Sequence, residues 1–287
     1  MKTLFGILSA LILVVSFSSC QKEVDGSLPG LVQNDSIIIQ QVIVLDTTFP
    51  VSTDTAIVSQ ISYDASKRIS KDIFTQYNVG VATTPVNRHD YMYKYSGINN
   101  YPDYIIDDFK DLIDPSNNYL DTIFFTYSNG FVASDSIGGS ADYIVTNFSK
   151  LSNTRYKMLQ KSPGIGGGVY IDTTYIYTQW QNENLTKEID SLWIPSFSLW
   201  DVSTATLVYD SKPNPFKNLV VPYPAPVNND VMSFGIEALF LPTTNNIVNW
   251  ADDGGTTILT YQYGSNGMPK IARDSDGIKV LYGYTKL

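Results

Sequence analysis

A short tyrosine-centred motif recurs along this chain at a nearly constant spacing. Successive motif tyrosines are separated by 32, 32, 50, 32 and 54 residues. Three equal intervals predict a duplicated structural unit, because a fixed period is the sequence signature of a repeat architecture. The members of the series are Tyr63, Tyr95, Tyr127, Tyr177, Tyr209 and Tyr263.

Each motif has the pattern of a β-hairpin. The residue two positions before each tyrosine is large and apolar or aromatic, and side chains two apart share one face of a strand. Turn residues follow most of the tyrosines. After Tyr127 they include Asn129-Gly130, a strong hairpin signal because both residues tolerate positive φ. A second strand pattern comes next, as in residues 68–73 and 268–273. The predicted unit is therefore strand, tight turn, strand and longer loop.

The rest of the chain also favours strands. Residues 37–45 and 56–63 are rich in β-branched side chains and too short for confident helices. We predict a mostly β fold, an antiparallel meander of repeated hairpins with about 10–14 strands, forming an open sheet or a partly closed barrel. Residues 102–113 fit an amphipathic helix slightly better than the second strand of the Tyr95 unit.

The N-terminus has the pattern of a secretory signal peptide over residues 1–19. A basic start with Lys2 precedes an apolar stretch, residues 4–17, which is too short to span a membrane. The only cysteine, Cys20, comes directly after the small residues Ser18 and Ser19. This segment resembles a bacterial lipobox, with Phe17 where leucine is usual, which implies lipidation of Cys20. The alternative is an ordinary cleaved signal with an incidental cysteine.

We divide the chain into the signal peptide, a lipidated and flexible N-terminus over residues 20–34, and a single β-repeat domain over 35–287. Residues 21–25 resemble the signals that send Bacteroidota lipoproteins to the cell surface, although they are also consistent with a solvated tether. An outer-membrane lipoprotein is predicted, with the cell surface favoured over the periplasmic face.

The hairpin motifs resemble the tyrosine-rich β-repeats of the RHS/YD type in a degenerate form. Together with the lipobox, they resemble more closely a group of uncharacterised Bacteroidota lipoproteins with a porin-like, open β-meander. The resemblance covers residues 55–287, although 152–168 and 221–253 depart from the period. It implies no catalytic residues.

Composition excludes several classes of function. The formal net charge is -9 and no basic run is present, so nucleic-acid binding is not expected. One cysteine and one histidine cannot build a Cys/His metal cluster or an internal disulfide. We predict no cofactor and no metal site. The one ion with some support is calcium, because residues 114–121 and the segments at Asp252 and Asp274 are rich in oxygen ligands. Those segments are equally typical of turns.

Candidate catalytic residues are few. The only histidine, His89, is predicted to lie in an exposed loop, and no Gly-X-Ser-X-Gly motif is present. Glu183 and Glu188 flank a predicted turn and are expected to be solvated. No sequence feature pairs two carboxylates as a glycosidase requires. The tryptophans are candidate ligand-binding aromatics, with a structural role in the sheet as the alternative: Trp180, Trp193, Trp200 and Trp250.

These features predict a non-enzymatic lipoprotein of the cell envelope that acts as a scaffold or a binding module. Its partners would be the membrane, through the N-terminal lipid, and a glycan or an envelope protein. The alternative is a surface glycan-binding lipoprotein of a polysaccharide-uptake system. A glycoside hydrolase that depends on aspartate or glutamate is a weaker alternative.

Overall fold

The computed structural model describes residues 37–46, 54–78, 84–97, 100–138, 143–163, 169–194, 198–217, 243–275 and 277–286. All of these belong to one of the two units into which the contacts divide the chain, Asn34–Leu287. The predicted signal peptide, Cys20 and the linker lie outside the described residues.

The described residues form one antiparallel sheet of 17 strands. The mostly β, antiparallel meander is confirmed, with more strands than the 10–14 expected. The strands are β1 (Ile37–Asp46), β2 (Asp54–Tyr63), β3 (Ile69–Tyr77), β4 (Pro85–Lys94), β5 (Tyr104–Asp111), β6 (Tyr119–Ser128), β7 (Phe131–Gly138), β8 (Tyr143–Ser152), β9 (Arg155–Pro163), β10 (Val169–Gln181), β11 (Asn184–Ile194), β12 (Leu199–Pro213), β13 (Asn245–Asp252), β14 (Gly255–Ile258), β15 (Thr260–Tyr263), β16 (Pro269–Arg273) and β17 (Ile278–Lys286).

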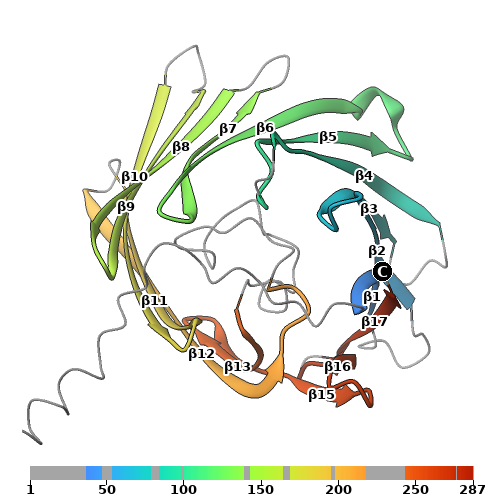
Figure 1. Cartoon of the computed structure of the whole chain (residues 1–287). Helices are drawn as coiled ribbons and strands as arrows, with labels where there is room; N and C mark the ends of the chain where they lie inside the picture. Colours follow the sequence, from blue (N-terminus) through green and yellow to red (C-terminus); the bar gives the residue numbers. More distant parts are fainter. Residues whose placement is uncertain are drawn as a thin grey trace, which may run out of the picture. The chain divides into compact units, whose positions relative to one another are not determined.

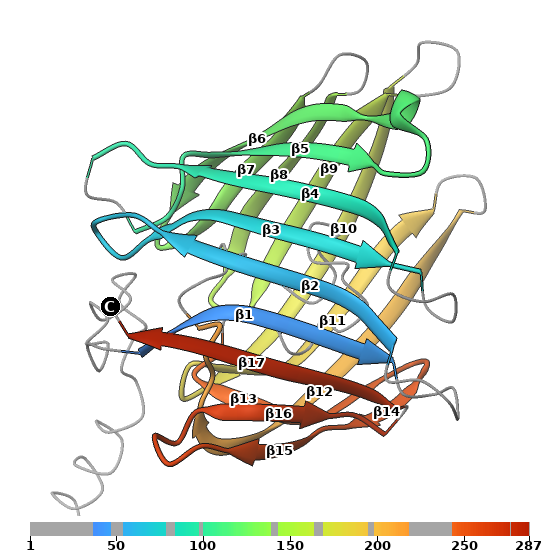
Figure 2. The ribbon, with the colours of Figure 1, turned by 90° about the vertical axis from the view of Figure 1, so that its right-hand side faces the viewer.

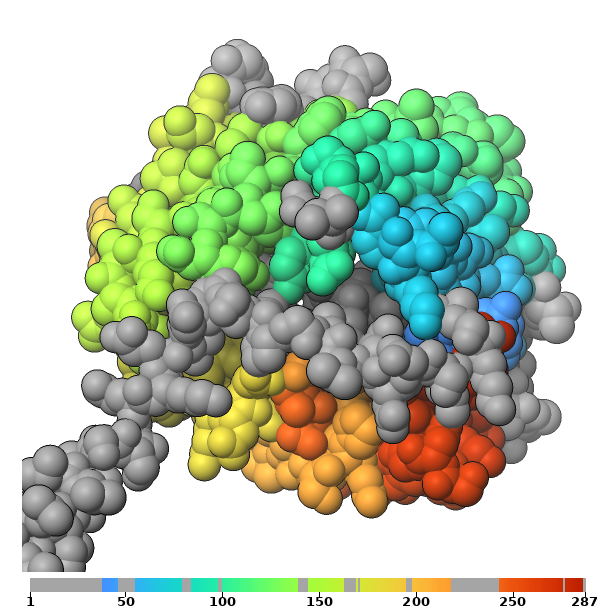
Figure 3. Space-filling model, viewed as in Figure 1, coloured from blue at the N-terminus to red at the C-terminus, as the bar shows by residue number. Residues whose placement is uncertain are grey.

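The sheet curls into a nearly closed barrel (Figure 1). Strand β17 pairs antiparallel with β1, so the first and last strands are neighbours (Figure 2). One seam is unsealed: β14 pairs with β13 and β15 pairs with β16, but no described ladder joins β14 to β15. Leu259 alone separates β14 from β15 along the chain. In the space-filling view, the colours run round the molecule in the order of the sequence, from blue through green and yellow to red (Figure 3).

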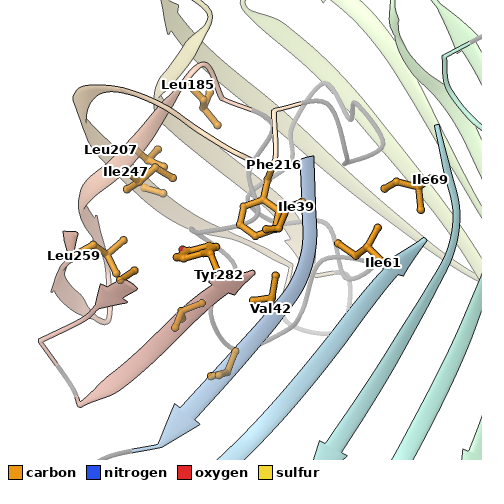
Figure 4. Close-up of a cluster of buried hydrophobic side chains, with 14 residues drawn as sticks. Ile39, Val42, Ile61, Ile69, Leu185, Leu207, Phe216, Ile247, Leu259 and Tyr282 are labelled. Atoms are coloured by element: carbon orange, nitrogen blue, oxygen red, sulfur yellow. The ribbon is translucent and has the colours of Figure 1, made fainter. Parts of the chain in front are cut away.

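One hydrophobic cluster identifies the side chains that point into the barrel. It joins strands from distant parts of the wall, such as β3 through Ile69 and β11 through Leu185, and only inward side chains can meet in this way (Figure 4). Phe216, which follows β12, packs against Tyr282 of β17 with ring centroids 6.0 Å apart. Because side chains alternate along a strand, the cross-strand register then assigns each described residue to the inner or the outer face.

Four motif tyrosines fasten neighbouring strands together. Each donates a hydrogen bond from its hydroxyl to a backbone carbonyl 24–26 residues earlier in the chain. A register shift immediately precedes three of them, and such a bulge re-aims the side chain that follows. The pairs are Tyr63 with Ile39, Tyr95 with Ile69, Tyr127 with Pro102 and Tyr209 with Leu185.

The other two motif tyrosines have different roles. Tyr177 lies on the outer face of β10, where its hydroxyl accepts a hydrogen bond from Gln179 Nε2 at 2.7 Å. Tyr263 donates to the carboxylate of Asp210. The backbone bond in that unit comes instead from Tyr261, whose hydroxyl donates to the Ile247 carbonyl at 2.8 Å. The spacing of the series therefore locates the hairpins better than it locates the hydrogen-bonding tyrosine.

The predicted helix over residues 102–113 is wrong. Residues Tyr104–Asp111 form strand β5, which is paired with β4 on one side and β6 on the other. Pairing on both edges overrides the helical spacing of the apolar residues, since tertiary context outweighs local propensity. A short 3-10 helix, Pro115–Asn117, follows this strand. No helix of the described residues is long and apolar enough to cross a membrane.

The tyrosine hydroxyls contribute to stability, which a pair of substitutions tests. Tyr127→Phe removes a 2.8 Å bond to the Pro102 carbonyl from a half-buried site. We expect a loss of about 1 kcal/mol in the free energy of unfolding, the usual net worth of one such bond, measured by urea titration. Tyr177→Phe is the control, and it should leave the unfolding midpoint unchanged. Equal effects of the two substitutions would show that the backbone bond has no special value.

Candidate functional site

An aromatic cluster lies on the outer face of the barrel wall. Trp200 of β12 sits beside Trp193 of β11 and Tyr175 of β10, with ring centroids 5.1 Å and 5.6 Å away. Tyr175 points outward because its chain neighbours Thr174 and Ile176 are buried on the inner face. Trp200 is 46% exposed and Tyr175 is 42% exposed. The structure thus brings two of the predicted ligand aromatics together and adds a tyrosine that the sequence pattern does not single out.

Apolar and basic side chains surround these rings. Ile171 of β10 is 51% exposed and Val202 of β12 is 53% exposed, both on the same outer face. The ammonium of Lys157 lies 5.9 Å from the centre of the Tyr175 ring. We call Ile171, Tyr175, Trp193, Trp200 and Val202 the outer aromatic patch. Exposed apolar surface of this kind marks sites of interaction.

The other two tryptophans belong to the structure of the barrel. Trp180 and Trp250 are partly buried and pack against the inner hydrophobic cluster. The Trp250 indole nitrogen donates to Asp252 Oδ2 at 3.0 Å. For these two residues, the structural interpretation fits better than a ligand-binding one.

His89 lies within strand β4, so the prediction of an exposed loop histidine is wrong. Its Nδ1 lies 2.9 Å from Asp107 Oδ1 on the neighbouring strand β5. Its ring stacks on Tyr91 at 5.3 Å and contacts Phe109 at 4.7 Å between centroids. The side chain is 20% exposed. The residues next to His89 in the sequence resemble a turn, so they do not indicate a strand. The segment is a strand because other strands pair with it on both sides.

Two acidic residues meet on the inner face of β11. Glu188 is fully buried, so its predicted solvation is wrong, and Asp190 is 5% exposed. Residues two apart share one face of a strand, so both carboxyls point inward. Opposite Glu188 lie Thr178 of β10 and Ala205 of β12. The Glu-X-Asp spacing within a strand is the signal in the sequence that could have found this pair.

The environment of this pair changes its titration. Burial raises the pKa of Asp190 to about 7, and its interaction with Glu188 opposes that rise. A carboxyl buried in this way favours its neutral, protonated form.

Glu183 behaves differently from Glu188. It occupies the turn between β10 and β11 with a positive φ of 62°. Its carboxylate forms an ion pair with Lys217 at 2.7 Å and is 41% exposed.

The oxygen-rich segments act as turns. Asp114 Oδ1 accepts from the Ser116 amide at 3.0 Å and caps the 3-10 helix, and Asp252 Oδ1 accepts from the Gly254 amide at 2.8 Å. Asp274 Oδ1 likewise accepts from the Ile278 amide at 2.7 Å. Within the described residues, no three His, Cys, Asp or Glu side chains are grouped as metal ligands. The absence of a metal site stays a prediction, and calcium stays the one ion with some support from the sequence.

Comparisons with known proteins give similar folds only. No family model matches this chain, and no curated protein matches it. One match is the crystal structure of a porin-like protein from Bacteroides uniformis. The matched region covers 87% of this chain and 98% of that protein's chain, with 14% sequence identity and a TM-score of 0.49. A porin-like protein from Bacteroides vulgatus covers 87% and 99%, with 11% identity and the same TM-score of 0.49. The resemblances to lipoproteins and to RHS/YD repeats stay predictions.

The raised pKa of Asp190 predicts how stability depends on pH. The folded state holds its proton up to about pH 7, whereas the unfolded state releases it near the ordinary value of 3.8. The free energy of unfolding should therefore fall as the pH rises from about 4 to 7, and then level off. The loss is on the order of 2–4 kcal/mol, at about 1.4 kcal/mol for each pKa unit. Burial also raises the pKa of Asp72 to about 6, so it contributes in the same direction.

Asp190→Asn should flatten much of this slope, measured by urea unfolding at several pH values. The facing residues Ile176 and Ser203 do not titrate, so Glu188 is the one ionisable group directly beside it in the ladder. Asp201→Asn at an exposed position of β12 is the control and should keep the wild-type slope. An unchanged slope in the Asp190 variant would show that the raised pKa of Asp190 is not the cause of the pH dependence.

Proposed function

We propose that this chain is a non-enzymatic lipoprotein of the cell envelope that acts as a glycan-binding module. A lipid on Cys20 would hold it at the outer membrane, with the barrel displayed at the cell surface. The observation that carries the binding role is the outer aromatic patch. Support for the anchor comes from the lipobox-like sequence that ends at Cys20.

A contiguous group of exposed aromatic and apolar side chains marks a site of interaction. Trp200 and Tyr175 leave nearly half of their surface in water, on a wall where the strand pattern could have placed polar residues. Aromatic rings combine a large apolar surface with a fixed geometry, and their flat faces suit the apolar faces of sugar rings. Lys157, near Tyr175, can donate hydrogen bonds to hydroxyl groups. This combination favours a saccharide over a purely apolar ligand.

A protein partner is the second candidate, because tryptophan and tyrosine also dominate protein interfaces. The two candidates differ in what they need. A sugar needs rings flanked by polar groups, as on this wall, whereas a stable protein interface buries about 800 Å² on each partner. A role in a polysaccharide-uptake system would follow from glycan binding at the cell surface.

Substitutions in the outer aromatic patch test the glycan role. Trp200→Ala should weaken binding at least tenfold, because loss of one stacked ring removes about 1.4 kcal/mol or more. Affinity gel electrophoresis through a panel of soluble polysaccharides measures this. Trp250→Phe is the control, since Trp250 packs against the inner cluster and its substitution should leave retardation unchanged. If no polysaccharide retards the wild-type chain, the glycan role is wrong and a protein partner becomes the leading candidate.

The anchor is tested separately. Cys20→Ser should move the protein from the membrane fraction to the soluble fraction, because a lipid chain and not a basic surface would hold it. Protease treatment of intact cells then decides its orientation: loss of the barrel places it outside, and protection places it in the periplasm. A hydrolase activity abolished by one aspartate or glutamate substitution would overturn the non-enzymatic part of the proposal.

A further inference from the structure

Three basic side chains follow the outer face of strand β9, beside the outer aromatic patch. They are Arg155, Lys157 and Lys161, whose spacings of two and four residues place them on one face of the strand. The ladder with β10 sets that face, because Lys157 lies opposite Tyr175 and Lys161 lies opposite Ile171. We call these three bases the basic row. It borders the outer aromatic patch along one strand.

The basic row has no acidic counterpart on its own face. None of its three side chains forms an ion pair with a residue that the structure describes. Outward bases of β3, β4 and β5 differ in this respect. Lys71 and Arg88 both pair with Asp90, and Lys110 pairs with Asp108. The barrel wall therefore neutralises its outward bases on those strands, whereas the bases of β9 keep their charge free for a ligand.

Acidic side chains near the basic row and the patch point the other way. Strands β8 and β9 contain no acid. The acids that the ladder register places on the inner face are Asp172, Glu188, Asp190 and Asp201. At the margin of the outer face, three strands from β9, the Asp253 carboxylate accepts a hydrogen bond from the Thr204 amide at 3.1 Å. A chain with a net charge of -9 thus presents a locally basic face here.

Rings and bases on this face lie within reach of one bound molecule. The Lys157 ammonium is 5.9 Å from the centre of the Tyr175 ring. Lys157 and Lys161 are four residues apart, or about 13 Å along a strand, so they can hold negative groups at separate points of an extended chain. Lysine and arginine form strong, charge-assisted hydrogen bonds with anionic oxygens. The face therefore suits an extended ligand that has both flat apolar surfaces and negative charge.

We propose that the outer aromatic patch and the basic row together bind an acidic polysaccharide, one that carries carboxylate or sulfate groups. This inference rests on the proposed function, because it names the class of glycan that the same site takes. The rings would stack on the sugar faces, and the basic row would pair with the acidic groups. A neutral glycan would use the rings and leave the bases without a partner.

An anionic membrane surface also attracts rings and bases, but it fits this face less well. Ser191 lies between Tyr175 and Val202 in the line that crosses the patch. A serine hydroxyl both donates and accepts hydrogen bonds, which suits sugar hydroxyls and has no use against acyl chains. The membrane is therefore kept as an outcome of the test.

Isothermal titration calorimetry with matched pairs of polysaccharides tests this inference. The full chain carries Cys20→Ser, so that no lipid contributes to binding. One pair is polygalacturonate and its neutral methyl ester, and the other is dextran sulfate and dextran, so the two pairs separate carboxylate from sulfate recognition. We expect one acidic member to bind at least tenfold more tightly than its neutral counterpart. Its affinity should fall as NaCl rises, because salt screens exposed charge.

Substitutions in the basic row locate the binding. Lys157→Gln with Lys161→Gln should weaken binding of the acidic polysaccharide about tenfold. The matched control is Lys94→Gln with Lys110→Gln, which removes the same charge from the outer face of β4 and β5 and should change affinity less than twofold. If circular dichroism shows that the first double variant does not fold, the exposed Lys161→Gln alone takes its place. Equal losses in the two double variants would overturn the inference, since binding would then follow net charge.

Failure of this inference differs from failure of the proposed function. If only neutral polysaccharides bind, the acidic class is wrong and the glycan role stands. If no polysaccharide binds, both are wrong. Sedimentation of the Cys20→Ser chain with phosphatidylglycerol vesicles, but not with phosphatidylcholine vesicles, would identify the face as a membrane contact if no acidic polysaccharide binds. That result would also overturn the inference.

Discussion

The backbone ladder between β1 and β17 is the interaction on which the rest of the structure depends. It joins the two ends of the described chain over nearly the whole length of both strands. Long strands with an open edge would expose many unpaired amide and carbonyl groups, and pairing β1 with β17 leaves only the short strands β14 and β15 at the unsealed seam. Closure also turns one face of every strand toward the interior. Only then can Val42 of β1 and Leu207 of β12 belong to one buried cluster (Figure 4).

Closure gives the two faces of the wall different chemistry. Strand alternation places Tyr175 outside and its neighbours Thr174 and Ile176 inside. The same alternation puts Asp107 inside and Asp108 outside within one strand. An exposed aromatic patch and an acidic interior can thus share adjacent strands without contact.

Sequence reasoning succeeds where the information is local and fails where it is not. Asn129-Gly130 forms a tight turn with positive φ at both residues, as the dipeptide predicts. The predicted loop position of His89 is wrong because β3 and β5 fix the surroundings of this residue, and its sequence neighbours do not. The predicted solvation of Glu188 is wrong because its spacing to Asp190 shows only that the two side chains lie on the same face of a strand. The spacing does not show which face of the strand is buried.

The sequence by itself determined the strand-turn-strand units and the positions of the tyrosines, because period-two alternation and turn chemistry are properties of adjacent residues. It also carries the lipobox-like segment at Cys20. Only the tertiary structure decided which face of each strand is inside, which aromatic rings meet and which acids gather. Alternation defines two faces but not their direction, and that direction is settled when the last strand pairs with the first.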